Sequence, residues 1–108
     1  MGAGRARDVE LYGSTGLRAL PLVRGDAVAM TVLRVRAGGE IGRHAAPADQ
    51  LFVVTAGRGT VSGDDGQWHP ITAGEAVLWS TGEQHATRAE EDLTALVLEL
   101  PALSIVEA

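Results

Sequence analysis

Residues 38–57 read GGEIGRHAAPADQLFVVTAG, and this stretch gives the clearest indication of how the chain folds. Glycines open and close it, and they mark breaks between β-strands because glycine accepts turn geometries that other residues avoid. Side chains alternate along a strand, and Pro47 bends the chain, so Gln50 returns to the face that carries His44. One hairpin therefore presents a histidine and a glutamine on the same side.

The apolar run that follows, Leu51-Phe52-Val53-Val54, is hydrophobic on both faces of the expected strand. Antiparallel sheets commonly leave one face in water, so the outer face here must be covered as well, by a second sheet or by another subunit. A homodimer satisfies this requirement, and we expect one.

The rest of the chain shows the same pattern of short apolar runs separated by glycine-rich breaks. Valine, leucine, isoleucine and threonine dominate the runs, and none keeps a helical spacing over ten or more residues, so we expect almost no helix. Asp64-Asp65-Gly66 predicts a tight hairpin turn. This pattern is typical of a β-barrel or a sandwich. The expected strands are 28–35, 51–55, 59–62, 76–79 and 93–100.

Length and charge limit the organisation of the protein. A chain of 108 residues fits one domain, which we place at 9–108, after a polar, glycine-rich tail at 1–8 that we expect to be flexible. The formal charge of −5, with scattered acidic residues, argues against nucleic acid or an anionic membrane as a partner. No apolar stretch approaches the ~20 residues of a membrane helix, so we expect a cytoplasmic protein.

Absent residue types exclude several chemistries. The sequence contains no cysteine, lysine or asparagine, and all nine cationic residues are arginine. Disulfides, cysteine nucleophiles, thiolate metal sites and lysine Schiff bases are therefore excluded. Any catalysis must use histidine, acidic or hydroxyl side chains, or a metal.

Two segments resemble the conserved motifs of the cupin family. The first runs from Gly38 through His44 and Gln50 to Gly57, on the pattern G-x5-H-x-H-x3,4-E-x6-G. The second runs from Gly74 through His85 to Ala89, on the pattern G-x5-P-x-G-x2-H-x3-N. The resemblance implies an all-β, antiparallel double-stranded β-helix, or jelly-roll, barrel with a pocket at one end.

The departures from these motifs bear on the metal. Ala46 stands where the family has its second histidine, Gln50 where it has glutamate, and Ser80 and Ala89 where it has proline and asparagine. The resemblance implies His44 and His85 as imidazole ligands, with the Gln50 amide oxygen as a third. Two imidazoles and one oxygen suit Zn²⁺, Ni²⁺, Cu²⁺ or Fe²⁺. A neutral amide binds a cation more weakly than a carboxylate, so the site can also be empty.

Other side chains compete for roles in this pocket. Asp49 would supply a carboxylate only if the strand register shifted by one residue. His69, on a later strand, is either inward-facing or a histidine near the barrel rim. The expected ligand-pocket residues are Phe52, Trp79 and Thr87, for each of which plain packing is the alternative.

Three functions remain open for such a barrel. The leading hypothesis is a barrel that binds a divalent metal and a small organic molecule and turns it over as a metal-assisted isomerase, lyase or hydrolytic enzyme. The second is a metal-free binding or sensing module without catalysis. The third is an interaction protein with a vestigial pocket. Whether the protein is an enzyme stays open at this point.

Overall fold

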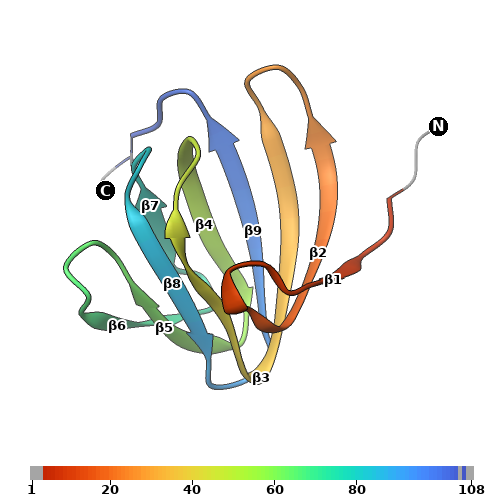
Figure 1. Cartoon of the computed structure of the whole chain (residues 1–108), viewed down its shortest axis with the longest axis vertical. Helices are drawn as coiled ribbons and strands as arrows, with labels where there is room; N and C mark the ends of the chain where they lie inside the picture. Colours follow the sequence, from red (N-terminus) through yellow and green to blue (C-terminus); the bar gives the residue numbers. More distant parts are fainter. Residues whose placement is uncertain (1–3, 105, 107–108) are drawn as a thin grey trace.

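This computed structural model describes residues 4–104 and residue 106. Within that part, strands dominate and no α-helix forms, as Figure 1 shows. None of the helical segments described there has the length and apolar character to cross a bilayer. The elements are β1 (Arg7–Val9), the 3-10 helix η1 (Leu11–Gly13), β2 (Thr15–Arg24), β3 (Ala29–Ala45), β4 (Asp49–Ala56), β5 (Arg58–Ser62), β6 (Trp68–Thr72), β7 (Ala76–Trp79), β8 (Gln84–Ala89) and β9 (Leu93–Leu100).

The prediction of an all-β antiparallel barrel is confirmed. The sheet order is β6-β5-β8-β3-β9-β4-β7; off this path β2 also pairs with β3, and β1 pairs with β2. Every pair of neighbouring strands in this order is antiparallel. A short turn joins β6 to β7, the two ends of this path, so the sheet nearly closes on itself.

Strand β3 belongs to both layers of the barrel. Residues 29–35 pair with β9, whereas residues 40–45 pair with β8. The chain bends between these halves at Gly38, whose φ is +82°, and at Gly39, where a side chain would collide with the carbonyl oxygen of Thr15. Figure 1 shows β3 running down beside β2 and β9 and returning beside β8.

The space between the two layers is filled by one hydrophobic cluster. Phe52 and Val54 of β4 point into it, while Leu51 and Val53 between them are only half-buried on the outer face. Strand alternation therefore separates the two apolar faces of this run as expected. The cluster contains Leu17, Val35, Ile41, Ala46, Phe52, Val54, Val61, Ile71, Trp79, Ala89, Leu93, Ala95 and Val97.

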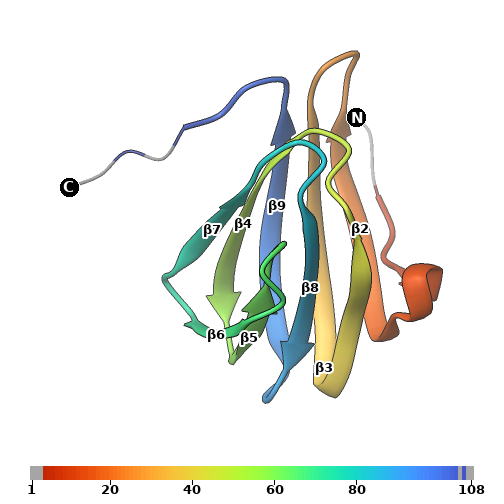
Figure 2. The ribbon, with the colours of Figure 1, turned by 60° about the vertical axis from the view of Figure 1, so that its left-hand side comes forward.

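The N-terminal strap, residues 9–14, lies against the second half of β3 (Figure 2). Tyr12 has a φ of +60°, a left-handed conformation that costs energy for any residue except glycine. Its carbonyl oxygen lies so close to Gly42 that no side chain fits at that position. The Ser14 hydroxyl accepts a hydrogen bond from the Gly42 amide at 3.0 Å. These contacts fix the strap on the barrel.

The expected tail at 1–8 is only partly covered by the structure. Residues 1–3 lie outside the described residues. Arg7 and Asp8 belong to β1, where they pair with Ala19 and Arg18 of β2. The described sheet thus begins before residue 9.

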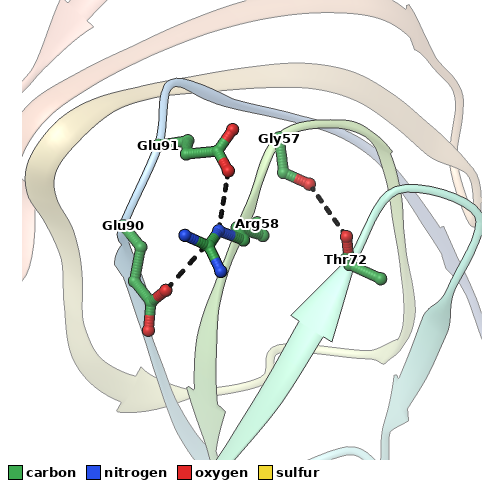
Figure 3. Close-up of polar contacts among 5 residues, drawn as sticks. All are labelled: Gly57, Arg58, Thr72, Glu90 and Glu91. Carbon is green, nitrogen blue, oxygen red and sulfur yellow. Dashed lines mark hydrogen bonds and ion pairs between the residues drawn. The ribbon is translucent and has the colours of Figure 1, made fainter.

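Polar contacts close the end of the barrel at which β8 finishes (Figure 3). Arg58 Nε lies 2.6 Å from Glu91 Oε1 and 3.7 Å from Glu90 Oε2, and all three side chains are more than half exposed. Thr72 donates its hydroxyl to the Gly57 carbonyl at 3.5 Å. Glu90, Glu91 and Asp92 form the connection between β8 and β9, and exposed pairs such as those of Arg58 add little to stability.

Candidate functional site

Two histidines face each other at the end of the barrel opposite this turn. His44 of β3 and His85 of β8 are cross-strand partners. Their ring centroids lie 4.3 Å apart and their planes are inclined by 56°. His85 is buried and His44 is half-buried, so the pair lies where the interior meets the barrel mouth.

Backbone carbonyls fix the tautomer of both rings. His44 Nδ1 lies 2.8 Å from the carbonyl oxygen of Gly42, and His85 Nδ1 lies 3.2 Å from that of Glu83. A carbonyl oxygen only accepts, so each Nδ1 must carry the proton. Each Nε2 then keeps a free lone pair, which is the arrangement of a histidine prepared to bind a metal.

Burial keeps His85 neutral. Loss of hydration lowers its pKa to about 4, because the buried ring cannot easily carry a charge, although the Glu83 carbonyl opposes this shift. A positive charge nearby, that of Arg43 or of His44 when it is protonated, pushes the pKa of His85 in the same direction as burial. At neutral pH the imidazole of His85 is therefore uncharged.

Two aromatic rings hold the histidine pair from either side. Tyr12 of the strap stacks on His44, with centroids 4.4 Å apart and planes within 6°. Trp79 of β7 stacks on His85 at 5.2 Å and 17°. The buried indole Nε1 of Trp79 has no hydrogen-bond partner among the described residues. The four rings form a ladder across the barrel mouth.

Gln50 and Glu99 form a second polar pair in the wall of the same cavity. They are cross-strand partners on β4 and β9, and Gln50 Nε2 donates to Glu99 Oε1 at 2.8 Å. Gln50 is buried, and Glu99 is half-buried. Sequence reasoning had not placed Glu99 near the site.

One small cavity joins these groups. Its volume is about 160 Å³, below the roughly 300–1,000 Å³ of pockets for drug-sized ligands. The lining combines apolar side chains with a few polar groups, an arrangement that suits a small organic ligand. The lining residues are Val9, Leu11, Tyr12, Ser14, Leu17, Thr31, Leu33, Ile41, His44, Gln50, Phe52, His85, Thr87, Val97 and Glu99.

The structure brings most of the expected site residues together. His44, Gln50, His85, Phe52 and Thr87 all line this cavity. Trp79 does not line it, and instead lies behind His85, against which it packs.

The remaining candidates lie elsewhere. Asp49 hydrogen-bonds the backbone amides of Thr81 and Leu103, which lowers the pKa of its carboxyl group, and it does not line the cavity. His69 is mostly exposed and lies 3.8 Å from Asp65. It borders a separate open groove of about 550 Å³ near the β5–β6 hairpin, which fits the alternative of a histidine at the rim.

The donor set bears on whether a divalent metal fits. Ala46 is buried in the hydrophobic cluster and has no donor atom. Among the described residues, no group of three or more histidine, cysteine or acidic side chains is close enough to hold a metal. The cavity nevertheless contains three donors of the types that zinc and related metals accept. They are the Nε2 atoms of His44 and His85 and the carbonyl oxygen of Gln50.

Sequence reasoning missed two residues of this site. Tyr12 reaches His44 from a segment about thirty positions earlier in the chain, and its left-handed backbone has no sequence signature. Glu99 shares the inward parity of Val97 on β9, so alternation along that strand was the signal that could have found it.

Comparison with protein families gives a match over most of the barrel. Residues 31–101 match the family model described as "Cupin domain", which covers both segments that carry the histidines. No curated protein matches the chain by sequence.

Solved structures share the fold at low sequence identity. An RmlC-like cupin from Shewanella frigidimarina aligns with a TM-score of 0.80 at 20% identity, covering 92% of this chain and 85% of that one. A predicted oxalate decarboxylase from Thermotoga maritima gives 0.79 at 18%, covering 92% of each chain. The polyketide cyclase RemF from Streptomyces resistomycificus gives 0.79 at 20%, covering 92% and 75%. At these identities the likeness concerns the fold.

Proposed function

This chain belongs to the cupin family, and from that premise we propose that it binds one divalent metal ion and one small organic ligand in the barrel cavity. The metal ligands in this proposal are His44 Nε2, His85 Nε2 and the Gln50 amide oxygen. The observation that carries it is the pair of backbone carbonyls that hold both histidines with Nε2 unprotonated. A buried histidine needs a partner for its ring N–H in any case, so the support lies in the Nε2 lone pairs that this arrangement leaves on two residues that both line the cavity.

The cavity fits this role in size and chemistry. A bound metal would act as a Lewis acid toward an oxygen of the ligand. The apolar walls, including Phe52, exclude water from the rest of the ligand, and Thr87 offers a hydroxyl beside His85. An isomerase, lyase or hydrolytic activity is consistent with this arrangement. Structural neighbours described as a polyketide cyclase and a predicted oxalate decarboxylase support a catalytic use of the fold.

A metal-free binding module is the second candidate. Its specific support is Ala46, which fills the position of a further imidazole with a buried methyl group. In that case His44, Gln50 and His85 would hydrogen-bond the ligand directly. The two functions differ in whether metal is required for ligand binding.

A homodimer and a cytoplasmic location remain part of the proposal. Two rows of half-buried apolar side chains cross the outer face of β3, β9, β4 and β7, and a second copy would cover them. Sedimentation of the protein beside a Leu51→Asp variant tests this, since the charge should leave a monomer. The rows contain Met30, Val32, Leu51, Val53, Leu78, Leu96 and Leu98.

Metal analysis tests the central proposal. We expect plasma mass spectrometry of the untagged protein, reloaded with Zn²⁺ and desalted, to find close to one metal per chain. The His44→Ala and His85→Ala variants should lose it, whereas His69→Ala, which removes an exposed histidine, should retain it. No metal in the wild-type protein after reloading would leave the metal-free module as the function.

A further inference from the structure

Glu99 lies next to the proposed metal site without being one of its expected ligands. We propose that the Glu99 carboxylate completes this site, by orienting the Gln50 amide and by supplying the negative charge that position 50 lacks. This inference rests on the proposed function, because it concerns the same divalent cation. Glu99 acts through Gln50 and is therefore a positioning residue.

The hydrogen bond decides which way the Gln50 amide points. A carboxylate oxygen only accepts hydrogen bonds, so the Gln50 NH₂ group must be the one that faces Glu99. The carbonyl oxygen Oε1 shares the same carbon and is turned away from Glu99. It has no hydrogen-bond partner among the described residues, so it is free to bind a cation.

The charge of the cavity also supports a role for Glu99 in the metal site. The three proposed donors, two neutral imidazoles and an amide, carry no charge to balance a divalent cation. Glu99 is the one carboxylate among the described residues that line the cavity. A carboxylate one hydrogen bond behind a ligand raises the donor strength of that ligand and favours the bound cation.

If Gln50 and Glu99 had a purely structural role, the variants below would give a different result. Gln50 and Glu99 also tie β4 to β9, and a hydrogen bond alone would serve that purpose. The Glu99→Gln variant keeps the shape and can still bond to Gln50, but it removes the charge. The Gln50→Glu, Glu99→Gln double variant moves the carboxylate to position 50 and leaves an amide at position 99, so the pair keeps its hydrogen bond and its net charge.

The test is a calorimetric titration of Zn²⁺ into chelator-treated protein. We expect Glu99→Gln to weaken the affinity for Zn²⁺ by roughly 10- to 100-fold, the range found for groups that support a metal ligand. The double variant should recover the wild-type affinity or exceed it. Glu40→Gln, which removes a carboxylate that pairs with Arg88 outside the cavity, serves as the control and should bind as the wild type does.

The possible outcomes distinguish the role of Glu99 from the existence of the metal site. Wild-type protein that binds no Zn²⁺ contradicts the proposed function. Wild-type protein that binds Zn²⁺ no more tightly than Glu99→Gln overturns the role of Glu99 and leaves the metal site standing. Loss of affinity in Glu99→Gln without recovery in the double variant also overturns it, because moving the charge should then have restored the site.

Discussion

His44 faces His85 across β3 and β8 because a β-bulge precedes it. Ile41 pairs with Thr87 and His44 pairs with His85, so three steps along β3 match two steps along β8. Strict alternation from the inward-facing Ile41 would turn His44 outward. The extra residue reverses that parity and directs the imidazole into the cavity, a use typical of bulges near functional sites.

Gly42 lies in this bulge and should not accept a side chain. Its Cβ would overlap the carbonyl oxygen of Tyr12, so Gly42→Ala must displace either the strap or the bulge. We expect the free energy of unfolding to fall by about 1–3 kcal/mol, the usual cost of overpacking. Trypsin should also cleave faster after Arg7, in β1 just before the strap. Urea denaturation and limited proteolysis measure the two effects.

Gly25 provides the matched control. It lies in the β2–β3 turn with no positive φ and with open space around its Cβ position. Gly25→Ala should change stability by no more than about 0.5 kcal/mol. Equal effects of the two substitutions would mean that the strap does not rest on Gly42.

The backbone of Tyr12 gives a second prediction. At a φ of +60° alanine is strained and glycine is not, so Tyr12→Gly should be more stable than Tyr12→Ala by about 1 kcal/mol. Both variants lose the stack on His44, so their difference reports on the backbone alone. In an ordinary conformation the order would be reversed, since glycine costs more entropy on folding. Parallel urea denaturation curves decide between the two.

The buried His85 should make the metal-free protein sensitive to acid. Its folded-state pKa of about 4 lies below the ordinary value of 6.5. The unfolded chain therefore takes up a proton at a higher pH than the folded one, and stability falls as the pH drops from about 6.5 to 4. The loss is at most about 3 kcal/mol. Urea denaturation of chelator-treated protein across this range measures it.

A variant isolates the contribution of this one histidine. His85→Gln cannot take up the proton, so its stability should decline less steeply between pH 6.5 and 4. Asp49, whose carboxyl pKa is lowered from 3.8, also begins to lose its stabilising effect at the acid end of this range, but it is present in both proteins, so the comparison cancels its contribution. Parallel pH profiles of the two proteins would show that His85 is not the residue responsible.

The ion pairs of Figure 3 should matter little. Arg58 and its two acidic partners are more than half exposed, so water screens their attraction. We expect Arg58→Ala to lower the free energy of unfolding by less than about 1 kcal/mol and to leave Zn²⁺ binding unchanged. A larger loss, or an effect on metal affinity, would mean that this end of the barrel is coupled to the cavity.

Most of the fold could be predicted from short-range patterns in the sequence. Runs of β-branched and leucine residues placed β4, β5, β7 and β9 within a few residues, and Gly66 marked the loop between β5 and β6. Strand β2 was not predicted, because Gly16, Arg18 and Pro21 interrupt its apolar pattern. The register shift near Pro21 shows the same irregularity in the pairing.

From the sequence, only those site residues that the spacing of the cupin motifs includes could be predicted. Positions 44, 50 and 85 follow that spacing and do line one cavity, but their metal binding stays a prediction. Tyr12 and Glu99 arrive from opposite ends of the chain, and only the closed barrel brings them to the histidines. The inward direction of His44 depends on a bulge that strict alternation does not reveal.

The most direct test of the metal site is a crystal structure of protein grown with Zn²⁺, with data collected at the zinc absorption edge. We expect one anomalous peak in the cavity, about 2.0–2.1 Å from His44 Nε2 and from His85 Nε2, with Gln50 Oε1 within about 2.2 Å. A cavity without a peak, or zinc bound only at His69 and Asp65 on the surface, would contradict it.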